Sequence, residues 1–253
     1  MIKFFRRIRF DLMEKNKTGK YLKYAIGEIL LVVIGILIAL SINNWNQAKT
    51  KVVKEIEILK SFQNQLENDL VEFDESLTFY KGAKKSIDVI LNHLENDLPY
   101  NDSINLHFFI STRTWGTSDL DNNVFETLKS IGIDLISNRD VRKQIVKIYE
   151  DDDVWIKEFE ATYINFLFNA SETIFNLRFK SFWEGDYTDL TFQGEMVPLN
   201  FDKLKSDQEY LYFLRTQKNH IGWLIEKPIE TTRTRVLELL TAIKKEIDRL
   251  ENK

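Results

Sequence analysis

The chain has 253 residues, no cysteine and a formal net charge of −4. The lack of cysteine excludes disulfides, thiol catalysis and cysteine-based metal sites. The length allows a membrane anchor plus one domain of ordinary size. Eighteen Phe and five Trp favour a folded core over disorder.

Residues 1–23 are strongly basic, and we predict that they form a cytoplasmic segment. They carry eight Lys or Arg and two acidic side chains, a net charge of +6, so the remainder of the chain sums to −10. Basic residues beside an apolar span stay in the cytoplasm by the positive-inside rule. The acidic remainder, which lacks a basic stripe, argues against nucleic acid as a partner.

Ala25–Ile42 is an almost unbroken apolar stretch with one charge, at Glu28. As a helix these residues would measure about 27 Å, close to the hydrocarbon core of a bilayer. We therefore predict a transmembrane helix over residues 24–45, surrounded by the lipid bilayer. The orientation of the basic segment then places residues 46–253 in the periplasm as a helical domain.

Aromatic residues flank the apolar stretch as they do at membrane interfaces, and the predicted interfacial anchors are Tyr21, Tyr24 and Trp45. A cleaved signal peptide is the alternative to a membrane anchor, because Ala39 and Ser41 form a small-x-small pair. The apolar region is longer than the ~7–15 residues of a signal peptide, and no polar segment precedes that pair. We favour an uncleaved signal anchor that crosses the inner membrane once.

Apolar residues recur at alternating steps of three and four along one helix face. Between residues 52 and 94, eleven of thirteen positions on this face are apolar, and the exceptions are Gln63 and Lys84. The pattern predicts one helix over about residues 25–97 that joins a coiled coil or a helical bundle. For residues 60–97 we favour packing within the chain itself.

Extended backwards, this face includes a candidate interaction surface in the membrane helix, formed by Glu28, Gly35 and Ala39. Small residues four apart let two membrane helices approach closely. An ionisable group within a membrane helix is a functional candidate. The alternative for Glu28 is that its side chain, one turn inside the boundary, reaches back to the cytoplasmic surface.

Helix signals continue through the rest of the chain. Gly132 is expected to end one helix as a left-handed cap, and Asn138 to cap the next. The expected elements are a short helix near Ile104–Arg113, a helix ending at Ile131, a long helix over about Arg139–Trp183, a hairpin or irregular loop near 184–205, a helix from Ser206 to Lys218 or beyond, and a last helix from Pro228. Together they predict an all-α fold, in which the transmembrane helix continues into an antiparallel bundle of four main helices.

We expect no catalytic residue, no metal and no cofactor, and hence no enzyme. No two of the three histidines have the helical spacing of zinc ligands: His93, His107 and His220. Asp119, Asp121 and Asn123 alternate like the start of a calcium loop, but Val124 replaces the required Gly, so helix capping explains them better. The run Asp151–Asp153 is expected on a solvated helix face. No phosphate-binding loop or nucleophile elbow occurs.

Two segments carry a family resemblance. Tyr24–Asn46 (YAIGEILLVVIGILIALSINNWN), preceded by MIKFFRRIR, and Phe125–Glu150 (FETLKSIGIDLISNRDVRKQIVKIYE) resemble a family of single-pass membrane proteins from Bacteroidota, domain of unknown function 6090. The resemblance implies a helical extracytoplasmic domain and no particular activity. In such a host, Asp102-Ser103-Ile104 resembles a three-residue O-glycosylation signal, which makes Ser103 a possible acceptor.

Two functions are compatible with these features. The first is a structural or protein-interaction (scaffold) role, in which the periplasmic bundle binds an unknown protein partner or a second copy of itself as a homo-oligomer. The alternative is a ligand-binding sensor, which would signal through a separate partner because residues 1–23 are too short for an output domain. In that case we expect the pocket at the aromatic-rich segment Phe166–Trp183 and the irregular segment near 184–205.

Overall fold

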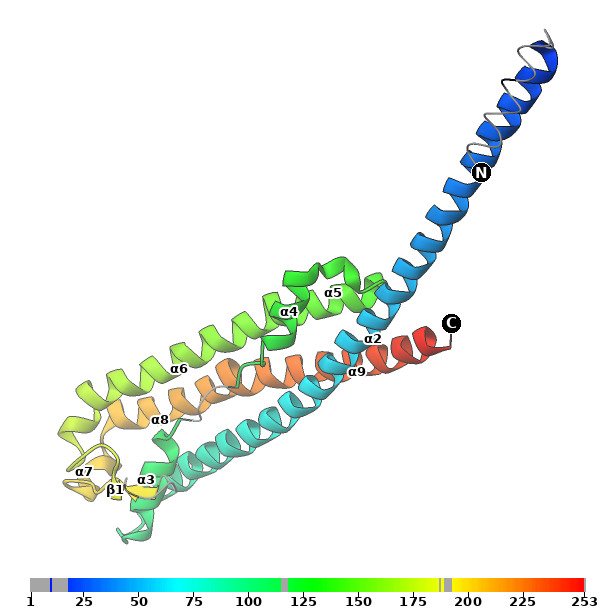
Figure 1. Ribbon diagram of the computed structural model, residues 1–253. Coiled ribbons are helices and arrows are strands. Elements are labelled where there is room, and N and C mark those ends of the chain that lie inside the picture. The colour runs from blue at the N-terminus through cyan, green and yellow to red at the C-terminus, as the bar shows by residue number, and fades with distance from the viewer. Residues whose placement is uncertain (1–9, 11–17, 115–117, 187, 189–192, 253) are drawn as a thin grey trace. The chain divides into compact units, whose positions relative to one another are not determined.

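The computed structural model describes residue 10 and residues 18–114, 118–186, 188 and 193–252 (Figure 1). The fold is all-α, as predicted, since the β-structure among these residues consists of two three-residue strands and one isolated bridge between Phe179 and Pro198. The chain divides into two compact units, Met1–Glu55 and Ile56–Lys253. The division falls inside one helix, α2 (Thr18–Glu95), whose range confirms the long helix expected from the apolar periodicity.

In the second unit, three long helical stretches are described where we expected four main helices. The first is α2 from Ile56 onward. The second joins α5 (Arg139–Lys147), a π-helical turn η2 (Ile148–Asp152) and α6 (Asp153–Thr173). The third joins α8 (Gln208–His220), a π-helical turn η4 (Ile221–Glu226) and α9 (Lys227–Glu251).

Two ends of the expected helices differ in detail from the structure. The last helix, α9, begins at Lys227 with Pro228 in its first turn, as expected, but no loop separates it from η4. Proline has no N–H to donate, and the π-helical turn directly before it changes the backbone hydrogen-bonding register. The helix expected to reach Trp183 ends at Thr173 instead, and a 3-10 turn, η3 (Phe175–Leu177), follows.

The three stretches are not all antiparallel. Three ion pairs of 2.7–2.9 Å join α2 to α9: Lys60–Glu251, Glu67–Lys244 and Asp74–Arg233. From one pair to the next, the residue number increases on α2 and decreases on α9. Two ring contacts join α2 to the α5–α6 stretch: Phe62–Tyr149 and Tyr80–Tyr163. Here the residue number increases on both sides. The α8–α9 stretch is therefore antiparallel to α2, as predicted, whereas α2 and α6 run in the same direction (Figure 1).

Two parallel helices need a crossover connection, and residues 96–138 supply it. This segment contains α3 (Ser103–Thr112), α4 (Asn123–Ile131) and a 3-10 turn, η1 (Ile133–Leu135). Gly132 follows α4 at a φ of 114°, a backbone conformation that favours glycine. The side chain of Asn138 accepts from the backbone N–H groups of Asp140 and Val141, which confirms its predicted role as an N-cap.

The predicted apolar face of α2 is the centre of the core. Within the second unit its buried members are Leu59, Leu66, Phe73, Leu77, Tyr80, Ile87 and Leu94. Each large apolar side chain that leaves water contributes about 1.5–3 kcal/mol. Packing within the chain, expected for residues 60–97, is therefore confirmed, and this part of α2 needs no second copy to bury its apolar face.

One end of the second unit is closed by a short hairpin and a cluster of aromatic rings. The strands β1 (Glu184–Asp186) and β2 (Gln193–Glu195) pair antiparallel, which confirms the hairpin expected near 184–205. A short helix, α7 (Phe201–Lys205), follows. The clustered rings, whose centroids lie 5.0–6.4 Å apart, are Phe175, Phe179, Tyr210 and Phe213. These rings fill the region where the sequence suggested a ligand pocket.

Candidate functional site

The apolar stretch Ala25–Ile42 lies within α2 and is not buried by other parts of the described chain. Among the described residues, this is the one helix long and apolar enough to cross a membrane. A soluble monomer rarely exposes a contiguous apolar patch of more than a few hundred Å². The stretch therefore needs an apolar environment other than its own chain.

The predicted interaction face of this stretch is accessible. Gly35 and Ala39 are exposed, and an added Cβ at Gly35 would meet nothing within 4 Å. Glu28 is half-buried. At the far end Trp45 is exposed, and the Lys49 ammonium lies 5.7 Å from its ring centroid. The side chains of the other two predicted anchors, Tyr21 and Tyr24, lie outside the described part of the structure.

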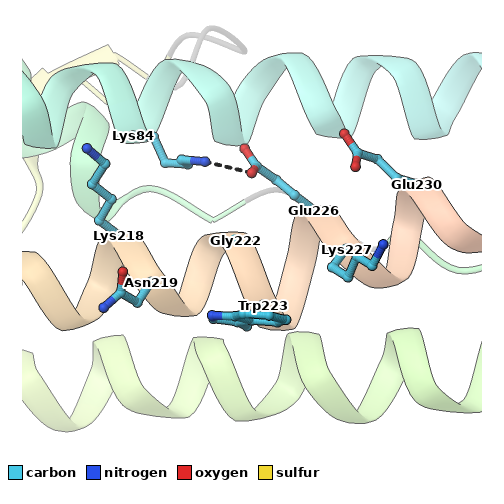
Figure 2. Close-up of a pocket in the computed structure, with 8 residues that line it drawn as sticks. All are labelled: Lys84, Lys218, Asn219, Gly222, Trp223, Glu226, Lys227 and Glu230. Atoms are coloured by element: carbon cyan, nitrogen blue, oxygen red, sulfur yellow. Dashed lines mark hydrogen bonds and ion pairs between the residues drawn. The ribbon is translucent and has the colours of Figure 1, made fainter.

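In the second unit, a groove of about 460 Å³ runs along the π-helical turn η4, facing α2 (Figure 2). Lys84, one of the two polar exceptions on the α2 face, reaches into it and pairs with Glu226 at 2.7 Å. Both side chains are largely shielded from water, at 29% and 14% exposure. The remaining lining residues are Lys218, Asn219, Gly222, Trp223, Lys227 and Glu230.

Trp223 connects this groove to a second one. Its side chain is 71% exposed and lies on the side of η4 toward α6 (Figure 2). There it lines a cavity together with Trp155 and Phe159 of α6, whose rings are 5.2 Å apart. We call Trp155, Phe159 and Trp223 the aromatic ledge. Exposed Trp side chains on a folded bundle are typical of surfaces that bind a partner.

The aromatic ledge was not identified from the sequence. In the sequence, Trp155 and Phe159 fall on the apolar stripe of the long helix expected over about Arg139–Trp183. The π-helical turn η2 inserts an extra residue just before Trp155 and Phe159. The side chains that point into the core after this turn are therefore different from those that continuous α-helical periodicity predicts. Consistent with this, Ile156 and Tyr163 are buried while Trp155 is exposed.

The same change of register overturns the expectation for Asp151–Asp153. Asp151 is exposed as expected, but Asp152 and Asp153 are buried. Asp152 pairs with Arg235 of α9, and burial still raises the pKa of its carboxyl. Asp153 accepts a hydrogen bond from the backbone N–H of Leu120 at 2.9 Å. Two of these three carboxylates therefore hold the bundle together.

The remaining candidate residues are scattered. Asp121 accepts from the backbone N–H of Asn123, but the N-cap of α4 is Asn122, so neither Asp119 nor Asp121 holds the predicted cap position. Asp119 pairs instead with Lys157 at 3.3 Å. No group of three metal-ligating side chains converges in the part of the chain that the structure describes. Ser103 lies at the exposed start of α3, bonded to Asn101, and its glycosylation stays a prediction.

We expect that Lys84→Met will destabilise the bundle by about 1–2 kcal/mol, because it leaves the shielded carboxylate of Glu226 without its counter-ion. One oxygen of that carboxylate, Oε1, already has no hydrogen-bond partner among the described residues. Chemical denaturation of the detergent-solubilised chain measures the change. The matched control is Lys60→Met, at an exposed pair, which should cost less than about 0.5 kcal/mol. Equal losses in both variants would contradict the expectation.

Comparison with known families gives one match. Residues 28–98 match the model of a family of unknown function, DUF6090. This confirms the predicted resemblance over the apolar stretch and the rest of α2, whereas the second resembling segment, Phe125–Glu150, lies outside the match. No curated protein and no solved structure matches the chain.

Proposed function

We propose that this chain, whose residues 28–98 form a DUF6090 segment, is a single-pass inner-membrane protein with an interaction or scaffold role. The observation that carries the proposal is the exposed apolar stretch Ala25–Ile42, which leads along α2 into a folded helical bundle. The described residues contain no converging metal ligands, and nothing in the groove or on the aromatic ledge resembles a catalytic constellation. The binding role that we propose for the bundle rests on the groove and the exposed aromatic ledge, and the lack of an enzymatic role stays a prediction from the sequence.

The proposed orientation places the N-terminus in the cytoplasm and the bundle in the periplasm, on the strength of the net charge of +6 in residues 1–23. Alkaline phosphatase, which is active only outside the cytoplasm, tests this when fused after Lys253. An active fusion supports the orientation. An inactive fusion, together with an active cytoplasmic reporter at the same position, would reverse it.

The proposed partner is a protein that docks on the aromatic ledge or a second copy of the chain. In vivo crosslinking through a photoreactive residue at Trp223 tests docking, with the same residue at the exposed position Glu75 as the control. A defined crosslinked species specific to position 223 supports an interaction role. A strictly monomeric chain that gives no crosslink at either position counts against it.

Gly35→Leu should weaken self-association while leaving membrane insertion intact, because it adds bulk at the point where two helices would approach most closely. The site itself has room, since an added Cβ at Gly35 would meet nothing within 4 Å. Gly27→Leu is the matched control, as it makes the same change about 100° around the helix from the predicted face. Crosslinking in native membranes measures the dimer fraction. If the dimer fraction falls equally in both variants, or in neither, the apolar stretch serves only as a membrane anchor.

A ligand-binding sensor is a second candidate, and the groove beside Lys84 and Trp223 favours it. A thermal-shift screen with small metabolites distinguishes the two roles, because a ligand that binds only the folded state raises the melting temperature by mass action. A hit that Trp223→Ala abolishes would support a sensor. A ligand that still stabilises the Trp223→Ala variant would have to bind outside the groove.

A further inference from the structure

Residues 118–122, directly before α4, form neither helix nor strand, and two of them are buried in the bundle. We call residues 118–122 the strap. Ser118 is completely buried and Leu120 is 2% exposed. A segment outside helices and strands lacks a regular backbone ladder, so its buried N–H groups need acceptors from elsewhere.

Three acidic side chains supply these acceptors, and all three are almost fully buried, at 1–4% exposure. Glu160 of α6 accepts from the N–H of Ser118 at 3.1 Å. Asp153, at the start of α6, accepts from Leu120 at 2.9 Å, and Asp69 of α2 accepts from Asp121 at 3.3 Å. The strap is thus fixed to α2 and α6 by carboxylates and not by a β-ladder.

The charges around these acids are unequal. Asp153 is paired with Lys157 at 2.6 Å, whereas neither Asp69 nor Glu160 forms an ion pair within the described ranges. Asp69 faces Glu72 on its own helix and, on the segments packed against α2, Asp121, Asp153 and the phenol of Tyr149. Glu160 faces Asp119 of the strap. Ionisation of Asp69 or Glu160 therefore adds an uncompensated negative charge inside the bundle.

Each of these two acids also has one free oxygen. Asp69 Oδ2 and Glu160 Oε1 are buried and have no hydrogen-bond partner among the described residues. A metal ion would need several converging ligands, and no such group is found in the part of the chain that the structure describes. A proton needs only one oxygen, so it fits these positions better than a cation does.

We propose that Asp69 and Glu160 form a proton-operated latch, which holds the strap when the two carboxyls are protonated and loosens it when they ionise. A neutral carboxyl keeps one oxygen as an acceptor for the strap N–H and carries its proton on the other. When the strap opens, water and counter-ions reach the carboxyl, so opening stabilises its ionised form. The latch lies within the second unit and does not depend on the proposed function.

The direction of the pH dependence follows from burial. Desolvation raises the pKa of Asp69 from its ordinary value to about 7, and burial also raises the pKa of Glu160. A carboxyl whose pKa is higher in the folded state binds a proton more tightly there than in the open state. The closed strap is therefore most stable below about pH 4, the ordinary carboxyl range, and loses stability as pH rises through 7.

Hydrogen exchange followed by mass spectrometry on the full detergent-solubilised chain tests the latch at pH 5.5 and pH 8. After correction for intrinsic exchange, protection of the 118–124 amides should fall about 30-fold between these values, since the opened carboxyl is ionised at both and pH 5.5 lies about 1.5 units below the pKa of Asp69 in the closed state. Asp69→Asn keeps an acceptor but cannot ionise, so the fall should largely disappear. Glu75→Gln, an exposed change on the same helix, should behave as wild type.

Two results would overturn the latch. The first is the same pH dependence in wild type and in the double variant Asp69→Asn/Glu160→Gln. The second is a loss of protection spread evenly over α2, α6 and α9. If Asp69→Asn does not fold, a carboxyl NMR titration of the wild-type chain decides the question. An Asp69 midpoint near 4 would exclude the latch, and a midpoint near 7 would support it.

Discussion

Two arginines placed at Val33 and Leu37 should remove the chain from the membrane fraction. Both positions lie near the middle of the apolar stretch, and both are exposed along α2. An arginine at the centre of a membrane helix costs about 2.5–3.5 kcal/mol on an insertion scale, so the pair shifts the insertion equilibrium more than 10³-fold. Carbonate extraction of isolated membranes, followed by immunoblotting, measures the fraction retained.

The matched control for this prediction places the same charges, four residues apart, just beyond the stretch. Asn46→Arg with Thr50→Arg, at two neutral exposed positions, should leave membrane retention as in wild type, because these positions lie outside the proposed hydrocarbon core. Retention of the Val33→Arg/Leu37→Arg chain at the wild-type level would show that this stretch is not the anchor. Release of both chains would show a general effect of added charge.

Features set by neighbouring residues were predictable from the sequence. The range of α2 follows from periodicity alone, because one apolar face repeats without a Pro or an interior break. The cap at Asn138 and the positive φ of Gly132 each depend on a few adjacent positions. The hairpin near 184–205 was suggested because helical periodicity stops there.

Features set by distant residues were not predictable. A π-helical turn has no simple sequence signature, and the two turns η2 and η4 change which side chains point inward. This is why Asp153 is buried, and why Trp155 lies on the surface. The parallel course of α2 and α6 depends on the crossover through residues 96–138, which local periodicity does not reveal.

The candidate sites also differ in whether the sequence alone reveals them. The apolar stretch was identified from the sequence, because a candidate membrane-spanning helix is recognised by its length and composition alone. The aromatic ledge was missed because an exposed Trp and a buried Trp look alike in sequence. A buried acid is likewise indistinguishable from a surface acid until the segment that covers it is known. The strap supplies that information for Asp69, Asp153 and Glu160.

Asp153→Ala is expected to be among the most destabilising single changes in the second unit. The carboxylate is 1% exposed and accepts from Leu120 N–H, from the Asn122 amide at 3.3 Å and from Lys157 at 2.6 Å. Its removal leaves a buried N–H and an ammonium without their acceptor, at a cost of about 3–5 kcal/mol in the free energy of unfolding.

Asp153→Asn separates the two parts of that cost. It keeps an acceptor for Leu120 N–H but removes the charge that pairs with Lys157, so a smaller loss of about 1–2 kcal/mol is expected. The neighbouring change Asp151→Ala, at an exposed position, should stay within about 0.5 kcal/mol of wild type. Urea denaturation at one pH compares the three variants. If Asp153→Ala matched Asp151→Ala, Asp153 would not hold the strap, because the strap would then keep its stability without its best-paired acceptor.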